Sequence, residues 1–239
     1  MVSAAILPLA IAGIEVRRRG RRILGPIDWR LEGEGITIVI GPNGAGKTTF
    51  LRSVHGLERL SRGTVRWSVA DDEARKRQAF VFQSPVVMRR SVADCIAYPL
   101  RLDGVAKAEA RARAAHWAAR VGLEPLLGRP AEVLSRGERQ KLALVRALIR
   151  EPEVLFLDEP CASLDGAATR EIESLLGQAR DNGTRIVMST HDMGQARRLA
   201  TEVIFLHQGR MRESGPATAF FAEQRTAEAR AFLNGDIVT

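Results

Sequence analysis

Residues 41–48 have the composition and spacing of a loop that binds a polyphosphate. The segment reads G-P-N-G-A-G-K-T and ends on Lys47 and Thr48. Glycines let the backbone turn so that successive N–H groups point at one anion, and the N-terminus of a following helix adds positive potential. In this pattern the lysine neutralises the outer phosphates and the threonine hydroxyl binds Mg²⁺. We therefore expect nucleotide contacts from Gly41, Pro42, Asn43, Gly44, Ala45, Gly46, Lys47, Thr48 and Thr49.

Two adjacent carboxylates, Asp158 and Glu159, follow an apolar run at residues 154–157. Such a run predicts a buried strand, and open α/β sheets bind ligands at the carboxyl ends of their strands. Two carboxylates repel a nucleotide unless a divalent cation lies between them, so the pair favours Mg²⁺ held by Asp158, with Glu159 polarising the attacking water. Alone, the pair is also compatible with helix-capping acids, and the glycine loop with an ordinary turn. Together they favour hydrolysis of ATP or GTP.

The elements predicted around these motifs alternate between strands and helices. Ile36–Ile40 is typical of a strand buried on both faces of a parallel sheet, and Lys47–His55 predicts a helix that ends at Gly56. The N-terminal part is rich in strands, and residues 83 to about 136 predict a helical insertion. These patterns indicate an α/β fold with a parallel core. Strands are also expected at residues 9–16, within 25–40 where Gly33 and Gly35 break the apolar alternation, and at 78–82, 154–157, 185–189 and 202–206. Helices are expected at 106–121, from 138, and around 172–179.

Composition and charge narrow the classes of function. Of 239 residues, 45% are hydrophobic and 27% are charged, which excludes wholesale disorder and a fibrous protein. The net charge of +8 suits an anionic partner without choosing among nucleic acid, phospholipid and phosphorylated small molecules. Cys95 and Cys161 lack metal spacing and favour a reducing compartment. No window approaches the roughly 20 apolar residues of a membrane helix, so a membrane role requires a partner.

Residues 134–141 resemble the signature of the ABC ATPase family, the nucleotide-binding subunits of ATP-driven transporters. The family signature reads L-S-G-G-Q, then a variable residue, then Q-R. The matching residues are Leu134, Ser135, Gly137 and Gln140, and the departures are Arg136, Glu138 and Lys141. Other family landmarks occur in order: Gln83 resembles the Q-loop glutamine, residues 163–165 the D-loop, and His191 the switch histidine. The resemblance covers nearly the whole chain.

The resemblance implies a P-loop NTPase fold of the ABC ATPase type within a single domain spanning residues 1–239. In this fold a RecA-like parallel-sheet core carries an N-terminal antiparallel β subdomain and an inserted α-helical subdomain. Residues 1–82 and 137–215 are expected to form the β subdomain and core, residues 83–136 the helical signature subdomain, and residues 216–239 a C-terminal helical tail.

The resemblance also implies a head-to-tail dimer, homomeric or heteromeric, that encloses two ATP molecules. The signature residues Ser135, Arg136, Gly137 and Glu138 of one chain are then expected to contact the nucleotide of the other, with Asp165 in the D-loop. Within one chain, His191 contacts the γ-phosphate, and Gln83 joins Thr48 and Asp158 around Mg²⁺.

Arg19 occupies the place where the family usually has an aromatic residue that stacks on adenine. A guanidinium group also lies flat over a base, so Arg19 is a candidate nucleotide contact. The alternative is a solvated basic turn, and under either interpretation the selectivity for adenine is open.

The implied partners are a transmembrane permease and an extracytoplasmic solute-binding protein, which place the chain at the cytoplasmic face of the membrane. Residues 84–88 and 91–94 are expected at the permease groove, although Val86, Val87 and Met88 are equally compatible with packing inside the helical lobe. Residues 82–92 and the tail from Phe220 to Val238 resemble ATPases of oxyanion importers, especially of the tungstate type, with phosphate and molybdate systems nearby.

Two other classes of function stay open from the sequence. One is a soluble ABC ATPase that acts on DNA or ribosomes, although the chain has neither the long coiled-coil insertion nor the tandem cassettes of those proteins, and no specific nucleic acid is expected. The other is a regulatory subunit that binds ATP with little turnover. Glu159 and His191 argue against the second class, whereas Arg136 and Glu138 keep it open.

Overall fold

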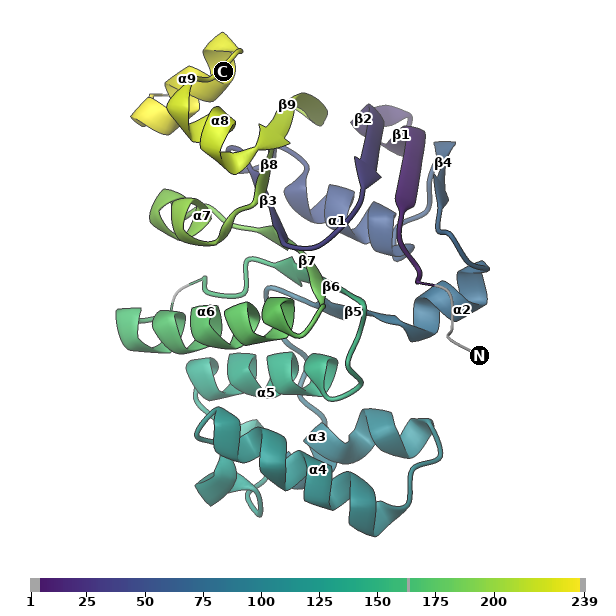
Figure 1. Cartoon of the computed structure of the whole chain (residues 1–239), viewed down its shortest axis with the longest axis vertical. Coiled ribbons are helices and arrows are strands. Elements are labelled where there is room, and N and C mark those ends of the chain that lie inside the picture. The colour runs from purple at the N-terminus through teal and green to yellow at the C-terminus, as the bar shows by residue number, and fades with distance from the viewer. Residues whose placement is uncertain (1–4, 163, 237–239) are drawn as a thin grey trace.

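The computed structural model describes residues 5–162 and 164–236, which form two β-sheets with helices packed against them (Figure 1). Three residues named above, Ser163 of the expected D-loop and Ile237 and Val238 of the tail, lie outside this described part of the chain. None of the helices in the described ranges combines the length and apolar character required to cross a bilayer.

The larger sheet has six strands in the order β5-β6-β7-β3-β8-β9. Every neighbouring pair is parallel except β8 and β9, which form an antiparallel hairpin turning at Gln208 and Gly209. β3, β6 and β7 are buried along their whole lengths, as their apolar sequences predict. The predicted parallel α/β core is confirmed. Its strands are β3 (Ile36–Ile40), β5 (Gln78–Val81), β6 (Val154–Asp158), β7 (Arg185–Ser189), β8 (Glu202–His207) and β9 (Arg210–Pro216).

The smaller sheet has three antiparallel strands in the order β2-β1-β4. They are β1 (Leu9–Arg18), β2 (Arg21–Leu31) and β4 (Arg62–Arg66). The chain leaves this sheet at Leu31 and enters the larger one at Ile36, through a turn in which Gly33 and Gly35 both have positive φ. β4 was not predicted, because its residues are mostly exposed and show no apolar alternation.

Helices cover both faces of the larger sheet. α1 packs on β6 and β7, whereas α5 and α6 lie side by side beyond the opposite face (Figure 1). α5 begins at Arg136, two residues before the predicted start, because Ser135 caps it. The helices are α1 (Lys47–His55), α2 (Asp71–Lys76), α3 (Val92–Leu102), α4 (Lys107–Arg120), α5 (Arg136–Leu148), α6 (Gly166–Asp181), α7 (Met193–Leu199), α8 (Ala217–Ala222) and α9 (Ala227–Asn234), with short 3-10 helices at Glu124–Leu126 and Ala131–Val133.

Side chains that alternate along the central strands build a separate apolar core on each face of the sheet. Ile38 and Leu157 point into the core shared with the helices of residues 83–148, whereas Val39 and Phe156 point into the core shared with α1 and the smaller sheet. Residues 83–136 contain α3, α4 and the two 3-10 helices. Because their apolar residues join the same cluster as one face of the sheet, this segment is packed onto the core.

Candidate active site

The glycine loop connects the carboxyl end of β3 to the N-terminus of α1, as predicted. Gly41, Gly44 and Gly46 all have positive φ, at 146°, 79° and 102°. A Cβ atom on Gly41 would lie 2.1 Å from the backbone oxygen of Leu206, so no larger residue fits there. Gly46 is the N-cap of α1 and offers no side chain to cap it, which leaves the first amides of the helix available to an anion.

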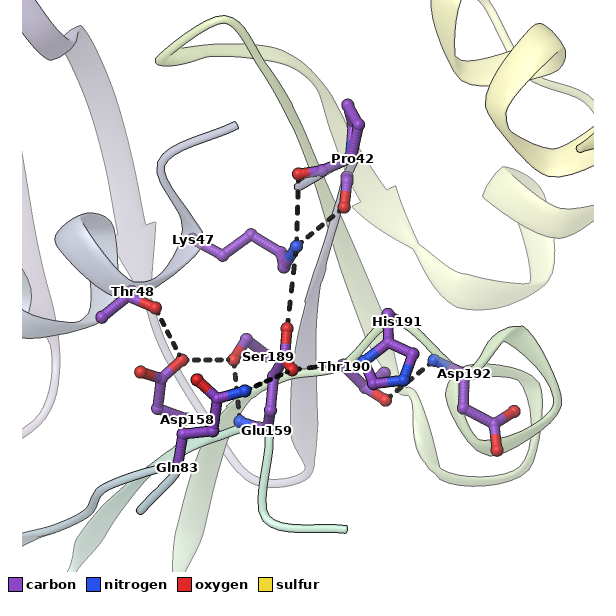
Figure 2. Close-up of polar contacts among 11 residues, drawn as sticks. Pro42, Lys47, Thr48, Gln83, Asp158, Glu159, Ser189, Thr190, His191 and Asp192 are labelled. Atoms are coloured by element: carbon purple, nitrogen blue, oxygen red, sulfur yellow. Dashed lines mark hydrogen bonds and ion pairs between the residues drawn. The ribbon is translucent and has the colours of Figure 1, made fainter. Parts of the chain in front are cut away.

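Lys47, the charged residue of the loop, is buried, with 6% of its surface exposed. Its Nζ donates to the carbonyl oxygens of Gly41 at 2.8 Å and Pro42 at 3.3 Å, and lies 3.8 Å from Oε1 of Glu159 (Figure 2). Burial lowers the pKa of Lys47, and the carboxylates of Glu159 and Asp158 oppose that shift. The ammonium group is therefore held at the mouth of the loop by carbonyls and a carboxylate.

Asp158 binds two hydroxyl groups through one oxygen. Its Oδ1 accepts from Thr48 Oγ1 at 3.0 Å and from Ser189 Oγ at 2.8 Å. The second oxygen, Oδ2, accepts no hydrogen bond within the described residues, although the residue as a whole is only 2% exposed. A hydroxyl beside a carboxylate is a set of hard oxygen donors of the kind that Mg²⁺ prefers.

Glu159 is the centre of the other contacts at this edge of the sheet. Its Oε2 accepts from Gln83 Nε2 at 3.1 Å and lies 3.2 Å from Nδ1 of His191 (Figure 2). Its φ is 46°, a left-handed conformation that is rare for a residue with a side chain and that clusters at functional sites. The structure thus brings Lys47, Gln83, Glu159 and His191 together from four separate segments.

Ser189 is a site residue that sequence reasoning missed. In addition to its contact with Asp158, its Oγ accepts from the backbone N–H of Glu159 at 3.0 Å, so one hydroxyl joins the two acidic residues. The available signal was a hydroxyl that follows three apolar residues at the end of a buried strand, two residues before His191. The downstream turn is fixed by Thr190, whose Oγ1 accepts from the N–H of Asp192 at 3.1 Å.

The signature residues lie at the N-terminus of α5 and form a capping box. The N–H of Glu138 donates to Ser135 Oγ at 3.3 Å, and the N–H of Ser135 donates to Oε2 of Glu138 at 2.7 Å. These hydrogen bonds lower the pKa of Glu138. Arg136 is exposed, and Gly137 faces the start of α6. Within the described residues, none of these four makes a hydrogen bond or ion pair with the glycine loop of its own chain.

Three other predicted site residues lie apart from the central contacts. Asp165 is the N-cap of α6, where its side chain accepts from the N–H of Ala168 at 2.8 Å. Arg19 is exposed at the turn between β1 and β2, with a φ of 50°. Thr49 lies in the first turn of α1, and its carbonyl accepts from Ser53 Oγ at 2.7 Å.

A groove of about 530 Å³ separates the sheet edge from α3 and α5 and begins beside Gln83. Phe82, Pro85 and Met88 line it. Val86 is 73% exposed, whereas Val87 and Met88 are half-buried against the core. The sequence left the packing of these three residues open. In the structure Val86 is exposed to solvent, and Val87 and Met88 are partly packed inside the helical segment.

Comparison with known proteins extends these observations over nearly the whole chain. A family model described as "ABC transporter" matches residues 24–162. The tungstate uptake system ATP-binding protein TupC of Peptoclostridium acidaminophilum is 37% identical over 217 residues, which cover 90% of this chain and 100% of TupC. The nickel import ATP-binding protein NikO of Rhodobacter capsulatus is 38% identical over 238 residues, covering 92% of each chain.

A solved structure has the same arrangement of elements. cbiO1 from Clostridium perfringens, described as part of the ABC transporter complex cbiONQ, superposes with a TM-score of 0.79 at 26% identity. The superposition covers 94% of each chain, so the likeness includes both sheets and the helices between them.

Proposed function

We propose that this chain, which belongs to the ABC transporter family and is one of its ATPases, couples ATP binding and hydrolysis to the uptake of a solute through a separate membrane permease. The observation that carries the proposal is the convergence of Lys47, Asp158, Glu159 and His191 at the carboxyl edge of one parallel sheet. The relatives named as uptake and import ATP-binding proteins support the direction of transport.

In this function the glycine loop binds the phosphates of ATP. The uncapped amides of α1 and the ammonium of Lys47 supply the positive charge, and Lys47 exchanges its contacts with Gly41 and Pro42 for phosphate oxygens. Thr48 and Asp158 would hold Mg²⁺, with Gln83 completing the set. When bound, this ion would neutralise the negative charge that develops on the phosphates. Arg19 is proposed as a flat contact for the base.

Glu159 is proposed to orient and deprotonate the attacking water. The carboxylate is held by Gln83 on one side and His191 on the other, and its backbone N–H is fixed by Ser189. In phosphoryl transfer most of the catalysis comes from positioning and from charge neutralisation. His191 then contacts the γ-phosphate, and Gln83 senses the occupied site, next in the chain to Phe82, which lines the groove.

A second ATPase subunit, most simply another copy of this chain, is proposed to complete the site. Ser135 and the amide of Gly137 lie at the N-terminus of α5 and make no hydrogen bond with the glycine loop of their own chain within the described residues. A helix N-terminus favours an anion, so these groups suit the γ-phosphate of a facing subunit. Arg136 adds positive charge there, which offsets the carboxylate of Glu138. Asp165 is proposed to lie at the same interface.

The permease is proposed to dock in the groove beside Gln83, which places the chain at the cytoplasmic face of the membrane. The groove is lined mostly by apolar residues, with charged side chains such as Arg146 and Arg150 among them, and it includes the exposed Phe82. Val86 is exposed and available for the contact. We propose the division into core (residues 1–82 and 137–215), helical subdomain (83–136) and tail (216–239) on the same basis.

The cargo is proposed to be an inorganic oxyanion, with tungstate first. TupC and the resemblance of residues 82–92 and of the tail support it. NikO is as similar in sequence as TupC yet is named for nickel, so overall identity does not discriminate between cargoes. The solute-binding protein of the complete importer would set the selectivity.

The test is reconstitution with the cognate permease, identified by co-purification from membranes. ATP hydrolysis is measured in vesicles that contain the permease and its binding protein, with tungstate, molybdate, phosphate or Ni²⁺ supplied outside. Stimulation by tungstate at the lowest concentration supports the proposal. Stimulation by Ni²⁺ alone would overturn the cargo, and a chain that hydrolyses ATP but never associates with a permease would overturn the transport function.

A further inference from the structure

The outer face of the helical segment contains a hollow with a basic lining. α3 and α4 pack side by side (Figure 1), and the hollow of about 560 Å³ lies along the surface that they share. On α3 its lining residues recur at helical spacing from Asp94 to Arg101, and on α4 they are Lys107 and Arg111. Four lining residues are cationic, namely Arg90, Arg101, Lys107 and Arg111, and among the described residues one, Asp94, is anionic.

The carboxylate in this lining is already engaged. Oδ1 of Asp94 accepts from Nε and Nη2 of Arg111 at 3.2 and 2.8 Å, and Oδ2 accepts from the hydroxyl of Ser91 at 2.9 Å. The hydrogen bond from Arg111 is the main cause that keeps the pKa of Asp94 below its usual range. Asp94 and Arg111 therefore neutralise each other, and three positive charges remain in the hollow.

None of these three cations forms an ion pair with an acidic residue in the part of the chain that the structure describes, although Lys107 is close enough to Asp94 to help lower the pKa of that carboxyl. The guanidinium of Arg90 lies over the ring of Tyr98, 4.9 Å from its centroid, and Arg101 donates to the carbonyl of Val105. Lys107 makes no hydrogen bond or ion pair there. Like charges gathered in a hollow repel each other and concentrate positive potential, which raises the local concentration of anions.

The backbone adds to the same potential. α4 begins at Lys107, and its N-cap Ala106 has no side chain that accepts from the first amides of this 14-residue helix. The acid of the first turn, Glu109, pairs with Arg113 and does not line the hollow. The uncapped N-terminus of α4 and three cations that form no ion pair within the described residues thus lie at one surface.

We propose that this hollow binds a phosphate-ester anion, either as a free small molecule or as the headgroup of a lipid. Guanidinium and ammonium groups together match the oxygens of a phosphate. The volume exceeds that of one tetrahedral oxyanion, and Ala97, Tyr98 and Leu102 supply an apolar rim for the organic part of an ester. Leu102 is 69% exposed. Tyr98 and Leu102 also line the groove beside Gln83, but the cations of the hollow do not. The inference does not rest on the proposed function, because phosphate binding there requires neither the ATP site nor a bound permease.

The test measures binding to the full chain in the presence of saturating Mg-ADP, which fills the glycine loop. Calorimetric titration with glycerol 3-phosphate probes a free ester. Sedimentation with phosphatidylcholine vesicles that contain phosphatidic acid probes a lipid headgroup, with pure phosphatidylcholine vesicles as the blank. Binding of one probe and not the other identifies the source of the phosphate.

Two matched double variants separate the hollow from the general basic charge of the chain. Arg90→Gln with Lys107→Gln removes two of the unpaired cations and is expected to weaken binding at least about tenfold. Arg66→Gln with Lys76→Gln removes the same charge from exposed side chains on β4 and α2 and is expected to leave the affinity within about twofold. The charge-preserving pair Arg90→Lys with Lys107→Arg should bind like the wild type.

Thermal unfolding of each variant shows whether the fold is retained. Because the substituted side chains are exposed, all three double variants are expected to unfold at the wild-type temperature. Failure of the wild type to bind either probe, or equal weakening in the two charge-removing variants, would overturn the proposal.

Discussion

Glu159 accepts a hydrogen bond from Gln83, contacts His191 and lies 3.8 Å from the ammonium of Lys47. The backbone of Glu159 has a left-handed φ, which costs a non-glycine residue on the order of 1–3 kcal/mol of stability. The contacts around Glu159 must offset this cost. The backbone hydrogen bond from Glu159 to Ser189 is one of those contacts. At the scale of single residues, the neighbours of Glu159 thus hold its backbone in an unfavourable conformation and its carboxylate in a fixed position.

The first prediction concerns the role of this carboxylate. Glu159→Gln keeps the shape and hydrogen-bonding capacity of the side chain but removes the base, so turnover is expected to fall about 10²–10⁴-fold while ATP binding is retained. Lys47→Ala is expected to weaken ATP binding itself. Steady-state phosphate release and nucleotide titration measure the two effects. Glu223→Gln, which changes an exposed acid in the C-terminal tail, is the control, and wild-type turnover by Glu159→Gln would refute the base assignment.

The second prediction concerns Ser189, which joins Asp158 to the backbone of Glu159. Ser189→Ala is expected to lower turnover about tenfold with little change in the KM for ATP, and to destabilise the fold by about 1–2 kcal/mol. Thr184→Val is the matched control, because it removes one hydrogen bond from a buried hydroxyl just before the other end of β7. Equal turnover in the two variants would show that Ser189 acts only on stability.

At the scale of elements, the N-terminus of α5 combines a cap with a proposed contact in trans. Ser135→Ala and Thr226→Ala each remove a cap whose side-chain oxygen lies 3.3 Å from a backbone nitrogen, so each is expected to cost about 1 kcal/mol of stability. Only Ser135→Ala is expected to lower ATP turnover. Denaturant unfolding and phosphate release measure both. A fall in turnover shared by both variants would reduce the effect to lost stability.

The C-terminal end of α1 makes stability depend on pH. Burial of His55 between Phe80 and Phe156, with a smaller contribution from Arg75, lowers its pKa to about 4. The unfolded chain takes up this proton near pH 6.5, before the folded chain does, so stability is lost as the pH falls from about 6.5 to about 4. His55→Phe is expected to remove up to about 3 kcal/mol of that loss, as measured by urea unfolding at several pH values. His116→Phe, on the exposed face of α4, should not.

The sequence predicted best those elements that are buried on both faces or that end at a glycine with a special backbone conformation. Ile36–Ile40 and residues 154–157 were predicted as strands because both of their faces are apolar, and Gly56 marked the end of α1. β4 and α2 were missed because exposed residues carry no apolar periodicity. The contacts of Glu159 with Gln83 and His191 were also beyond the sequence, since they depend on which strands are neighbours in the sheet.

At the scale of the whole molecule, the two parts of the proposed site lie on different elements of the chain. The glycine loop follows β3 in the centre of the larger sheet, whereas Ser135 begins a helix on the opposite side of β6 from α1 (Figure 1). No hydrogen bond or ion pair joins the glycine loop to Ser135 within the described residues. A single chain therefore leaves one side of the bound triphosphate open to a partner or to solvent. Association that depends on nucleotide is the consequence expected of this arrangement.

The most direct measurement is the mass in solution of the Glu159→Gln chain, determined by analytical ultracentrifugation with Mg-ATP, with Mg-ADP and without nucleotide. Of these three conditions, only Mg-ATP is expected to give a dimer. The double variant Glu159→Gln with Lys47→Ala is expected to stay monomeric in all three. A chain that binds Mg-ATP to saturation yet sediments as a monomer would contradict the account of a site completed by a second subunit.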